Sequence, residues 1–211
     1  NDIGLVVDAK DRDDKTKVET RYISSFDDNY KELWKYKYDI NENRENKKQI
    51  TYLKSNKDVI VFFNHTTDKN YSYINDYSLI FLNSKTGKLI SEFSFPNVDK
   101  NAYKVVDCFI KDKEITILGN YSNKSYYGHI NDDENKGLFN FTFSKETGKL
   151  IKSNYLNWED LSSKLDINKN GFIKKEGYIF IHNMLPLDNE KMIVVCETFE
   201  QSPIKTNNMY F

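Results

Sequence analysis

Short apolar runs separated by polar turns make up most of the chain. Residues 33–38 alternate strictly between apolar and polar side chains, whereas residues 59–63 and 115–119 are almost continuously apolar. A period of two predicts half-buried β-strands, and short apolar runs bounded by turns predict strands that are buried on both faces. The pattern therefore predicts an all-β protein built from antiparallel strands.

One stretch occurs twice. Residues 82–90 read Leu-Asn-Ser-Lys-Thr-Gly-Lys-Leu-Ile, and residues 143–151 read Phe-Ser-Lys-Glu-Thr-Gly-Lys-Leu-Ile. The two copies lie about 60 residues apart, and a degenerate copy at 26–34 lies about one period earlier, which predicts an array of like units. The glycine of each clear copy supplies the positive φ that a hairpin turn needs. We interpret the stretch as the turn between the third and fourth strands of a unit.

The strand pattern predicts four such units in a single domain, at residues 1–40, 50–96, 103–156 and 177–211. Four-stranded antiparallel units of this size are typical of β-propeller blades, which bury their faces against one another. Trp158, Leu161 and Leu165 have helical spacing and predict one short helix at 158–165. The first and last units are incomplete. We therefore expect a β-propeller-like array that is a partial propeller, or one in which the two end fragments combine into a blade.

The repeated turns also carry a resemblance. Residues 81–90 and 142–151 resemble the blades of bacterial quinoprotein-like (PQQ-like) propellers, which carry an Asp or Asn, a Thr-Gly pair and a Lys before the outer strand. Those repeats place a tryptophan near the turn for packing between blades, and only Trp34 matches it. Residues 177–184 and 188–191 are similar to secreted propeller-like families of uncharacterised function. The resemblance implies the propeller fold, and it does not carry over quinone binding or dehydrogenase chemistry.

Charge and hydropathy narrow the classes of partner. Lys and Arg number 31 against 32 for Asp and Glu, so the net charge of −1 gives no broad attraction to nucleic acid or anionic lipid. No apolar run approaches the roughly 18 residues of a membrane-spanning helix. The chain begins with Asn1 rather than Met, which a removed signal peptide or a trimmed chain would explain equally well. We expect a secreted, periplasmic or cell-envelope protein.

A calcium loop is the one cofactor site that the sequence suggests. Oxygen-bearing side chains alternate at Asp166, Asn168 and Asn170, a glycine follows, and Glu176 is the nearest later carboxylate. This order resembles the EF-hand loop, although its twelfth position is occupied by glycine and only one early ligand is charged. The alternative is an Asn/Gly turn that joins the helix to the next strand.

Other candidate residues have simpler explanations. Asp107 interrupts an apolar strand and would face a propeller channel, as in a glycoside hydrolase or polysaccharide lyase, or else bond a neighbouring backbone group or lysine. His65, His129 and His182 lack the spacing of zinc ligands, so structural or solvated roles are expected. Cys108 and Cys196 are expected to be buried free thiols, with a disulfide left open. Five Asn-x-Ser/Thr sequons are expected by chance in an Asn-rich chain.

The long polar loops at 64–75 and 120–135 occupy the same place in successive units, so they would meet on one rim. Tyrosine-rich loops make good contact surfaces at low entropic cost, although packing between blades is the alternative. The ligand-binding candidates are Tyr71, Tyr73, Tyr121, Tyr126 and Tyr127. We therefore expect a non-enzymatic binding or scaffold module for a protein or glycan; the alternative is a propeller hydrolase or lyase that uses channel carboxylates.

Overall fold

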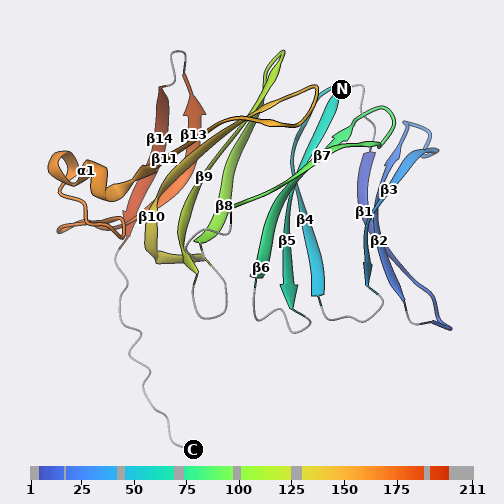
Figure 1. Cartoon of the computed structure of the whole chain (residues 1–211), viewed down its shortest axis with the longest axis horizontal. Coiled ribbons are helices and arrows are strands. Elements are labelled where there is room, and N and C mark those ends of the chain that lie inside the picture. The colour runs from blue at the N-terminus through green and yellow to red at the C-terminus, as the bar shows by residue number, and fades with distance from the viewer. Residues whose placement is uncertain are drawn as a thin grey trace, which may run out of the picture.

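The described part of the chain folds into four antiparallel β-sheets and one short helix (Figure 1). The computed structural model describes residues 5–16, 18–41, 46–68, 74–96, 101–124, 130–187 and 191–199. In every sheet the strands that are neighbours in sequence are also neighbours in space, as the turn-separated apolar runs predict. The all-β prediction is confirmed, and helix α1 (Trp158–Leu165) lies where its spacing predicts it.

The first and last sheets contain three strands each. Sheet one consists of β1 (Leu5–Arg12), β2 (Glu19–Phe26) and β3 (Glu32–Asn41). Sheet four consists of β12 (Phe172–Ile173), β13 (Gly177–Pro186) and β14 (Met192–Phe199).

The two central sheets contain four strands each. Sheet two consists of β4 (Asn46–Ser55), β5 (Val59–Asp68), β6 (Ile74–Asn83) and β7 (Leu89–Ser94). Sheet three consists of β8 (Asn101–Ile110), β9 (Glu114–Lys124), β10 (Ile130–Ser144) and β11 (Leu150–Asn157). The two sheets have the same topology, as the repeat predicts.

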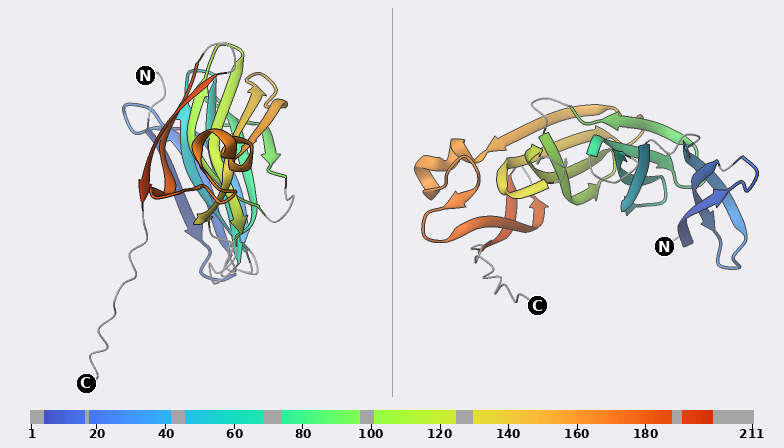
Figure 2. Two further views of the ribbon diagram at one scale, coloured as in Figure 1. Left: turned by 90° about the vertical axis from the view of Figure 1, so that its left-hand side faces the viewer. Right: turned by 90° about the horizontal axis from the view of Figure 1, so that it is seen from below.

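The sheets stack side by side along an open arc, with sheet one at one end and sheet four at the other (Figure 2). Strands β4 and β8 begin their sheets and lie toward the concave side, whereas β7 and β11 end their sheets and lie on the convex side. The described strands form no closed barrel or ring. We call each place where two sheets pack together a joint, numbered from the N-terminal end.

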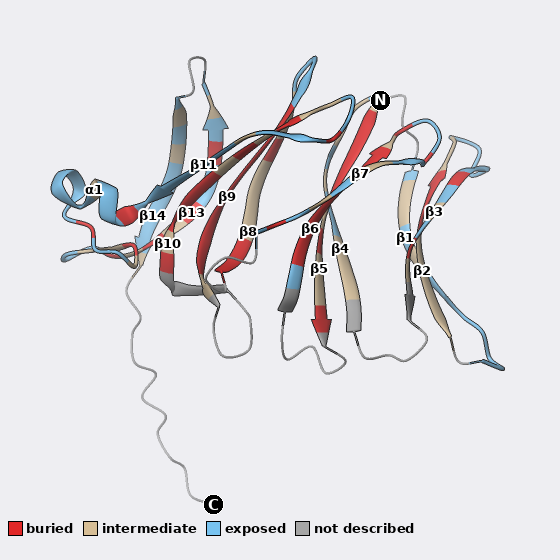
Figure 3. Cartoon of the chain, in the orientation of Figure 1, coloured by how far each residue is buried: buried red, intermediate tan, exposed pale blue. Residues whose placement is uncertain are grey.

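Alternate side chains of one strand enter different joints, which explains the continuous apolar runs. In β5, Ile60 and Phe62 pack into the first joint, whereas Val59 and Val61 pack into the second. Each central sheet is therefore buried on both faces, and the end sheets have one uncovered face each (Figure 3). A strand that is apolar on both faces is stable only between two layers.

The second joint has an aromatic core. Phe95 of sheet two lies with its ring centroid 4.7 Å from that of Tyr103 in sheet three, and the Phe93 and Phe143 rings are 5.0 Å apart. Aromatic pairs at these separations contribute about 0.5–1.5 kcal/mol beyond the apolar area that they bury. The high aromatic content of the chain is thus concentrated between the two central sheets.

The repeated turns are closed in the same way. In the first copy the Gly87 N–H donates to the Asn83 carbonyl at 2.9 Å, and in the second the Gly148 N–H donates to the Ser144 carbonyl at 2.8 Å. Both glycines have the expected positive φ, of 64° and 62°. The prediction that the Thr-Gly stretch reverses the chain between third and fourth strands is confirmed.

Each turn also contacts the last strand of the preceding sheet. The Trp34 Nε1–H of β3 donates to the Ser84 carbonyl at 2.9 Å, and the Ser91 hydroxyl of β7 donates to the Gly148 carbonyl at 3.0 Å. A further bond at the second joint links the Lys145 Nζ to the Asp58 carboxylate at 2.8 Å. The turns therefore connect neighbouring sheets as well as neighbouring strands.

Several sequence boundaries were wrong. Strand β1 continues through Arg12 although residues 8–12 are mostly charged, because one face of sheet one is uncovered and tolerates charged side chains. The two polar loops are shorter than expected, since β5 reaches Asp68 and β10 begins at Ile130. Strand β12 was not predicted, because two residues are too few to show a period.

Candidate functional site

A polar pocket of about 220 Å³ lies where sheet three meets helix α1 and the loop after it. The end of β9 contributes Asn123, β10 contributes Lys136, and the loop at 166–171 contributes Lys169 and Asn170. The remaining walls are Asn157, at the end of β11, and Glu159, in the first turn of α1. Five of the six lining side chains are amides or ammonium groups, and one is a carboxylate.

Asn157 is held in place from two sides. Its side-chain oxygen accepts a hydrogen bond from the Tyr121 hydroxyl, and its side-chain amide donates to Asp160 Oδ2 at 3.2 Å. Its backbone N–H also lies 3.3 Å from the same carboxylate oxygen, which caps the start of α1. The pocket wall is therefore ordered before any ligand arrives.

A cluster of tyrosines lies behind Asn157. The Tyr121 and Tyr155 ring centroids are 5.2 Å apart, and the hydroxyls of Tyr155 and Tyr103 lie 3.3 Å apart. Burial raises the pKa of both Tyr121 and Tyr155, and for Tyr155 the hydrogen bond with Tyr103 raises it further. These phenols stay protonated, so the Tyr121 hydroxyl remains a donor to Asn157.

The pocket also rests on fixed polar groups of sheet three. Asn135 is buried, and its side-chain oxygen accepts hydrogen bonds from the Trp158 Nε1–H at 3.2 Å and from the Gly137 N–H at 3.1 Å. The Lys136 Nζ donates to Asn101 Oδ1 at 3.2 Å. These bonds anchor the helix to the sheet and fix one of the two pocket lysines.

A protein-family model of unknown function, named DUF6770, matches residues 1–206. The chain belongs to the DUF6770 family. No functionally curated protein matches it. The family assignment brings no activity with it, so the residues of this DUF6770 protein have to be interpreted from their geometry.

The predicted calcium loop closes with its own hydrogen bonds in the DUF6770 chain. The Asn168 side-chain oxygen accepts the N–H groups of Asn170 at 2.9 Å and Phe172 at 3.0 Å, while the backbone carbonyl of Asp166 accepts from Lys174. Within the described ranges, no three acidic, histidine or cysteine side chains cluster in a way that would hold a metal ion. This donor set favours the structural alternative, an Asn/Gly turn, and Glu176 lies in the next turn along the chain. Calcium binding stays a prediction.

Only one of the five tyrosine candidates lies in the described part of the chain. Tyr121 is 5% exposed, so it acts on the pocket through Asn157 rather than through its own surface. Tyr71, Tyr73, Tyr126 and Tyr127 lie outside the described residues, as does His129.

The sequon asparagines at 64 and 120 are both 3% exposed, and Asn140 has a buried side-chain oxygen. An enzyme that attaches a sugar needs an accessible asparagine in a surface loop. These positions agree with sequons that arise by chance. Asn123 differs from them because it lines the pocket.

Asp107 uses its carboxylate locally. Its Oδ1 accepts the backbone N–H of Cys108 at 2.7 Å, at a point where the register between β8 and β9 shifts. This bond matches the backbone-binding alternative for Asp107. The open pocket described above contains Glu159 and no second carboxylate.

Both cysteines of the DUF6770 chain are free thiols. Burial, followed by the charge of Asp107, raises the pKa of Cys108 to about 12, so this thiol is inert. The expectation that Cys196 is buried was wrong, because β14 is a poorly covered strand and exposes it. His182 lies on the same sheet, with its Nε2 3.2 Å from the Glu197 carboxylate.

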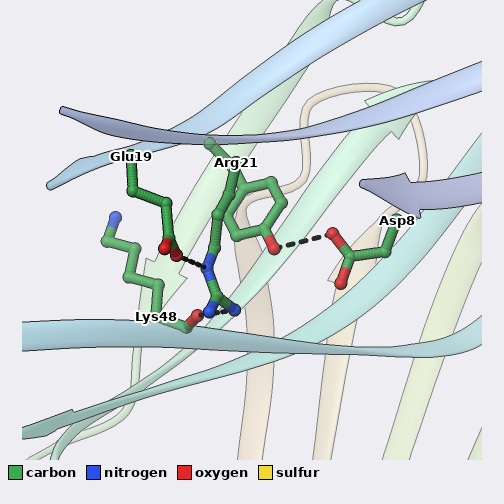
Figure 4. A network of polar contacts seen from close by, with 5 residues as sticks. Asp8, Glu19, Arg21 and Lys48 are labelled. Carbon is green, nitrogen blue, oxygen red and sulfur yellow. Dashed lines mark hydrogen bonds and ion pairs between the residues drawn. The ribbon is translucent and has the colours of Figure 1, made fainter. Parts of the chain in front are cut away.

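A second polar cluster lies at the first joint (Figure 4). The Arg21 guanidinium donates to Glu19 Oε1 at 3.1 Å and to the Lys48 backbone carbonyl at 3.2 Å, and the Tyr38 hydroxyl donates to Asp8 Oδ1 at 2.8 Å. Burial and then the bond to Asp8 raise the pKa of Tyr38. Each group is used by a neighbour, and Arg21 connects sheet one to β4, so the cluster is structural.

The sequence did not single out most pocket residues. The sequence predicts Asn170 as a calcium ligand and Tyr121 as a ligand contact, but no motif contains the other lining residues Lys136, Asn157, Glu159 and Lys169. They converge only because α1 folds back beside β10 and β11. The one sequence feature that points to this site is the interruption of the repeat after residue 156, where α1 and the loop after it begin.

Among the described residues, no helix has the length and apolarity to cross a bilayer. A secreted or cell-envelope location stays a prediction.

Proposed function

We propose that this chain is part of a β-propeller that acts as a non-enzymatic binding module, and that it recognises a glycan in the polar pocket. The propeller is supported by the face-to-face stacking of four meander sheets and by the position of the first strands on the concave side. Propeller blades bury their faces in this way, with each sheet covering its neighbour. On this proposal, the described strands form an open segment of such an array.

The composition of the pocket carries the proposal for a ligand. Asn123, Asn157 and Asn170 offer amide groups that both donate and accept, and the two lysines add charged donors. Sugar hydroxyls also donate and accept, so they match this set better than an apolar ligand or a flat protein surface does. The cavity of about 220 Å³ is below the usual 300–1,000 Å³ of drug-sized sites, which suits one sugar residue of a longer glycan.

The same residues support a proposal of binding without hydrolysis. Canonical glycoside hydrolysis uses two carboxyl groups at roughly 5–10 Å on either side of the scissile bond. Glu159 is the one carboxylate that lines the described pocket, and Asp107 Oδ1 accepts the backbone N–H of Cys108. The proposal is therefore for recognition of the glycan and not for its cleavage.

A printed glycan array tests the proposal. We expect the chain, displayed as a multivalent streptavidin complex, to bind a defined subset of glycans. Lys169→Ala should weaken that signal about tenfold or more, because hydrogen bonds to charged groups contribute roughly 1.5–3 kcal/mol. Asn123→Ala should weaken it about two- to tenfold, because a hydrogen bond between neutral groups contributes roughly 0.5–1.5 kcal/mol. Lys88→Ala, an exposed lysine on the turn of sheet two, is the matched control and should bind normally. An array without a binder, or binding that all three variants retain, would refute the glycan pocket.

A further inference from the structure

We propose that Tyr155 forms a second sugar-binding subsite beside the polar pocket, so that the pocket holds one residue of a glycan chain and the Tyr155 ring packs against the next. This subsite rests on the proposed glycan-binding function and extends it from one sugar residue to an oligosaccharide. We call the side chains of Ser153, Tyr155 and Asn157 on β11 the ledge.

The ledge lies on one face of β11 and leads into the pocket. Its members are every second residue of the strand, and the pairing with β10 is regular from Gly137 to Thr142, so the three side chains share one face. All three are exposed, and β11 lies on the convex side of the arc (Figure 2). From Ser153 to Asn157 the ledge spans about 13 Å. It ends at the pocket, because Asn157 is one of the pocket walls.

Tyr155 is the aromatic member of the ledge, and it is 40% exposed. It lies two residues before Asn157, at a distance of roughly 7 Å along the strand. Both residues contact Tyr121, whose ring centroid lies 5.2 Å from that of Tyr155 and whose hydroxyl donates to the Asn157 side-chain oxygen. A glycan that leaves the pocket along β11 therefore meets the Tyr155 ring first.

The Tyr155 ring is ordered before any ligand binds. Its hydroxyl lies 3.3 Å from the Tyr103 hydroxyl, and its ring contacts that of Phe141 with centroids 5.5 Å apart and planes at 78°. Because the hydroxyl is used within the protein, the carbon ring is the surface that Tyr155 offers to a ligand. A fixed tyrosine provides such a contact at low entropic cost.

The ligand class follows from the combination of ring and pocket. Sugar residues have C–H groups with small positive partial charges, and these groups pack against the negative face of an aromatic ring. The pocket supplies donors and acceptors for the hydroxyls of one residue, and Tyr155 supplies an apolar contact for its neighbour. A contact of this kind should raise affinity about two- to tenfold.

NMR titration of the whole chain with paired saccharides tests the subsite. The probes are glucose with cellotetraose, N-acetylglucosamine with chitotetraose, and mannose with mannotetraose. A tetrasaccharide that binds should do so more tightly than its monosaccharide. Tyr155→Leu keeps the apolar bulk but removes the aromatic ring. It should weaken the tetrasaccharide about two- to tenfold and leave the monosaccharide affinity unchanged.

Two further variants separate the ring from the rest of the strand. Tyr155→Phe keeps the ring and loses the contact with the Tyr103 hydroxyl, so it should bind the tetrasaccharide nearly as wild type does. Leu156→Ala is the matched control, because Leu156 is 36% exposed and lies on the opposite face of β11. It should change neither affinity.

Three results would overturn this subsite, and they differ in what they say of the pocket. If none of the six saccharides binds, the glycan-binding function is overturned as well. If Lys169→Ala weakens binding but Tyr155→Leu does not, the pocket stands without the subsite. If Tyr155→Leu weakens monosaccharide and tetrasaccharide equally, Tyr155 acts only by holding Tyr121 and Asn157 in place. Circular dichroism of each variant shows whether it is folded.

Discussion

The first and second joints use the same turn with different partners. At the first joint the indole of Trp34 packs on Gly87, and a β-carbon at residue 87 would lie 2.4 Å from an indole carbon. At the second joint the smaller Ser91 lies against Gly148, and a β-carbon there would lie 1.9 Å from the serine hydroxyl. The turn needs glycine at both joints, but the side chain that packs on the glycine differs: it is Trp34 at the first joint and Ser91 at the second.

The surrounding cores explain the difference. The second joint is filled by aromatic side chains from both sheets, including Phe81, Phe95 and Phe141. The first joint is mainly aliphatic on the side of sheet two, and sheet one contributes only three strands. Trp34 therefore supplies buried area that the rest of the first joint lacks, whereas at the second joint a serine is sufficient.

The largest expected effect is at Trp34. Trp34→Ala should lower the free energy of unfolding by about 3–5 kcal/mol, because it removes a buried aromatic side chain and leaves a cavity. The Trp34 Nε1–H bond to Ser84 is lost as well. Urea denaturation with an unchanged m-value is the measurement. A loss below about 1 kcal/mol would show that the first joint does not depend on this residue.

The turn glycines should come next. Gly87→Ala should cost about 2–4 kcal/mol, because alanine is strained at positive φ and its methyl group meets a rigid indole ring. Gly148→Ala should cost less, about 1–3 kcal/mol, since the serine hydroxyl can rotate away and only the Ser91 β-carbon, 2.8 Å from the new methyl group, has to shift. Thermal and urea unfolding of both variants give the comparison, and equal losses would contradict the difference between the joints.

Ser91 should matter less than Trp34. Ser91→Ala removes the hydrogen bond to the Gly148 carbonyl and should cost about 1 kcal/mol. The measurement is the urea midpoint beside that of Trp34→Ala. A loss as large as that of Trp34→Ala would mean that the two contacts are equivalent.

The smallest effect is expected at the ion pair of the second joint. The hydrogen bond from Lys145 lowers the pKa of Asp58. A carboxylate with a lowered folded pKa stabilises the fold above its unfolded pKa, and this stabilisation is lost as the pH falls below about 4. Wild type should therefore lose more stability on acidification than Asp58→Asn. Melting temperatures from pH 7 to pH 3 measure this, and parallel curves would contradict it.

Much of the fold follows from the sequence because its strands have strong periods. The doubly apolar runs at 59–63 and 115–119 identify the buried central strands, and the two Thr-Gly turns set the period. The sequence pattern predicts loops where the polar end of β5 and the polar start of β10 lie. These parts of the strands project past the core, so they need no apolar face and show no apolar pattern.

The candidate site was less predictable, because it depends on contacts between distant segments. Lys136 and Lys169 are ordinary surface lysines in the sequence, and they share a pocket only through the packing of α1. Tyr121 is of a residue type that often contacts ligands, but it is buried beside the ring of Tyr155. No local pattern contains this information.

The most direct test of turn-to-strand packing is a double-mutant cycle between Trp34→Ala and Gly87→Ala. If the indole packs on the glycine, removing it leaves room for the alanine methyl group, and Gly87→Ala should then cost only its backbone strain. The account predicts that the double variant is more stable than the sum of the single losses by about 1 kcal/mol or more. Losses that add within about 0.5 kcal/mol would show that the two residues are independent and would contradict the account.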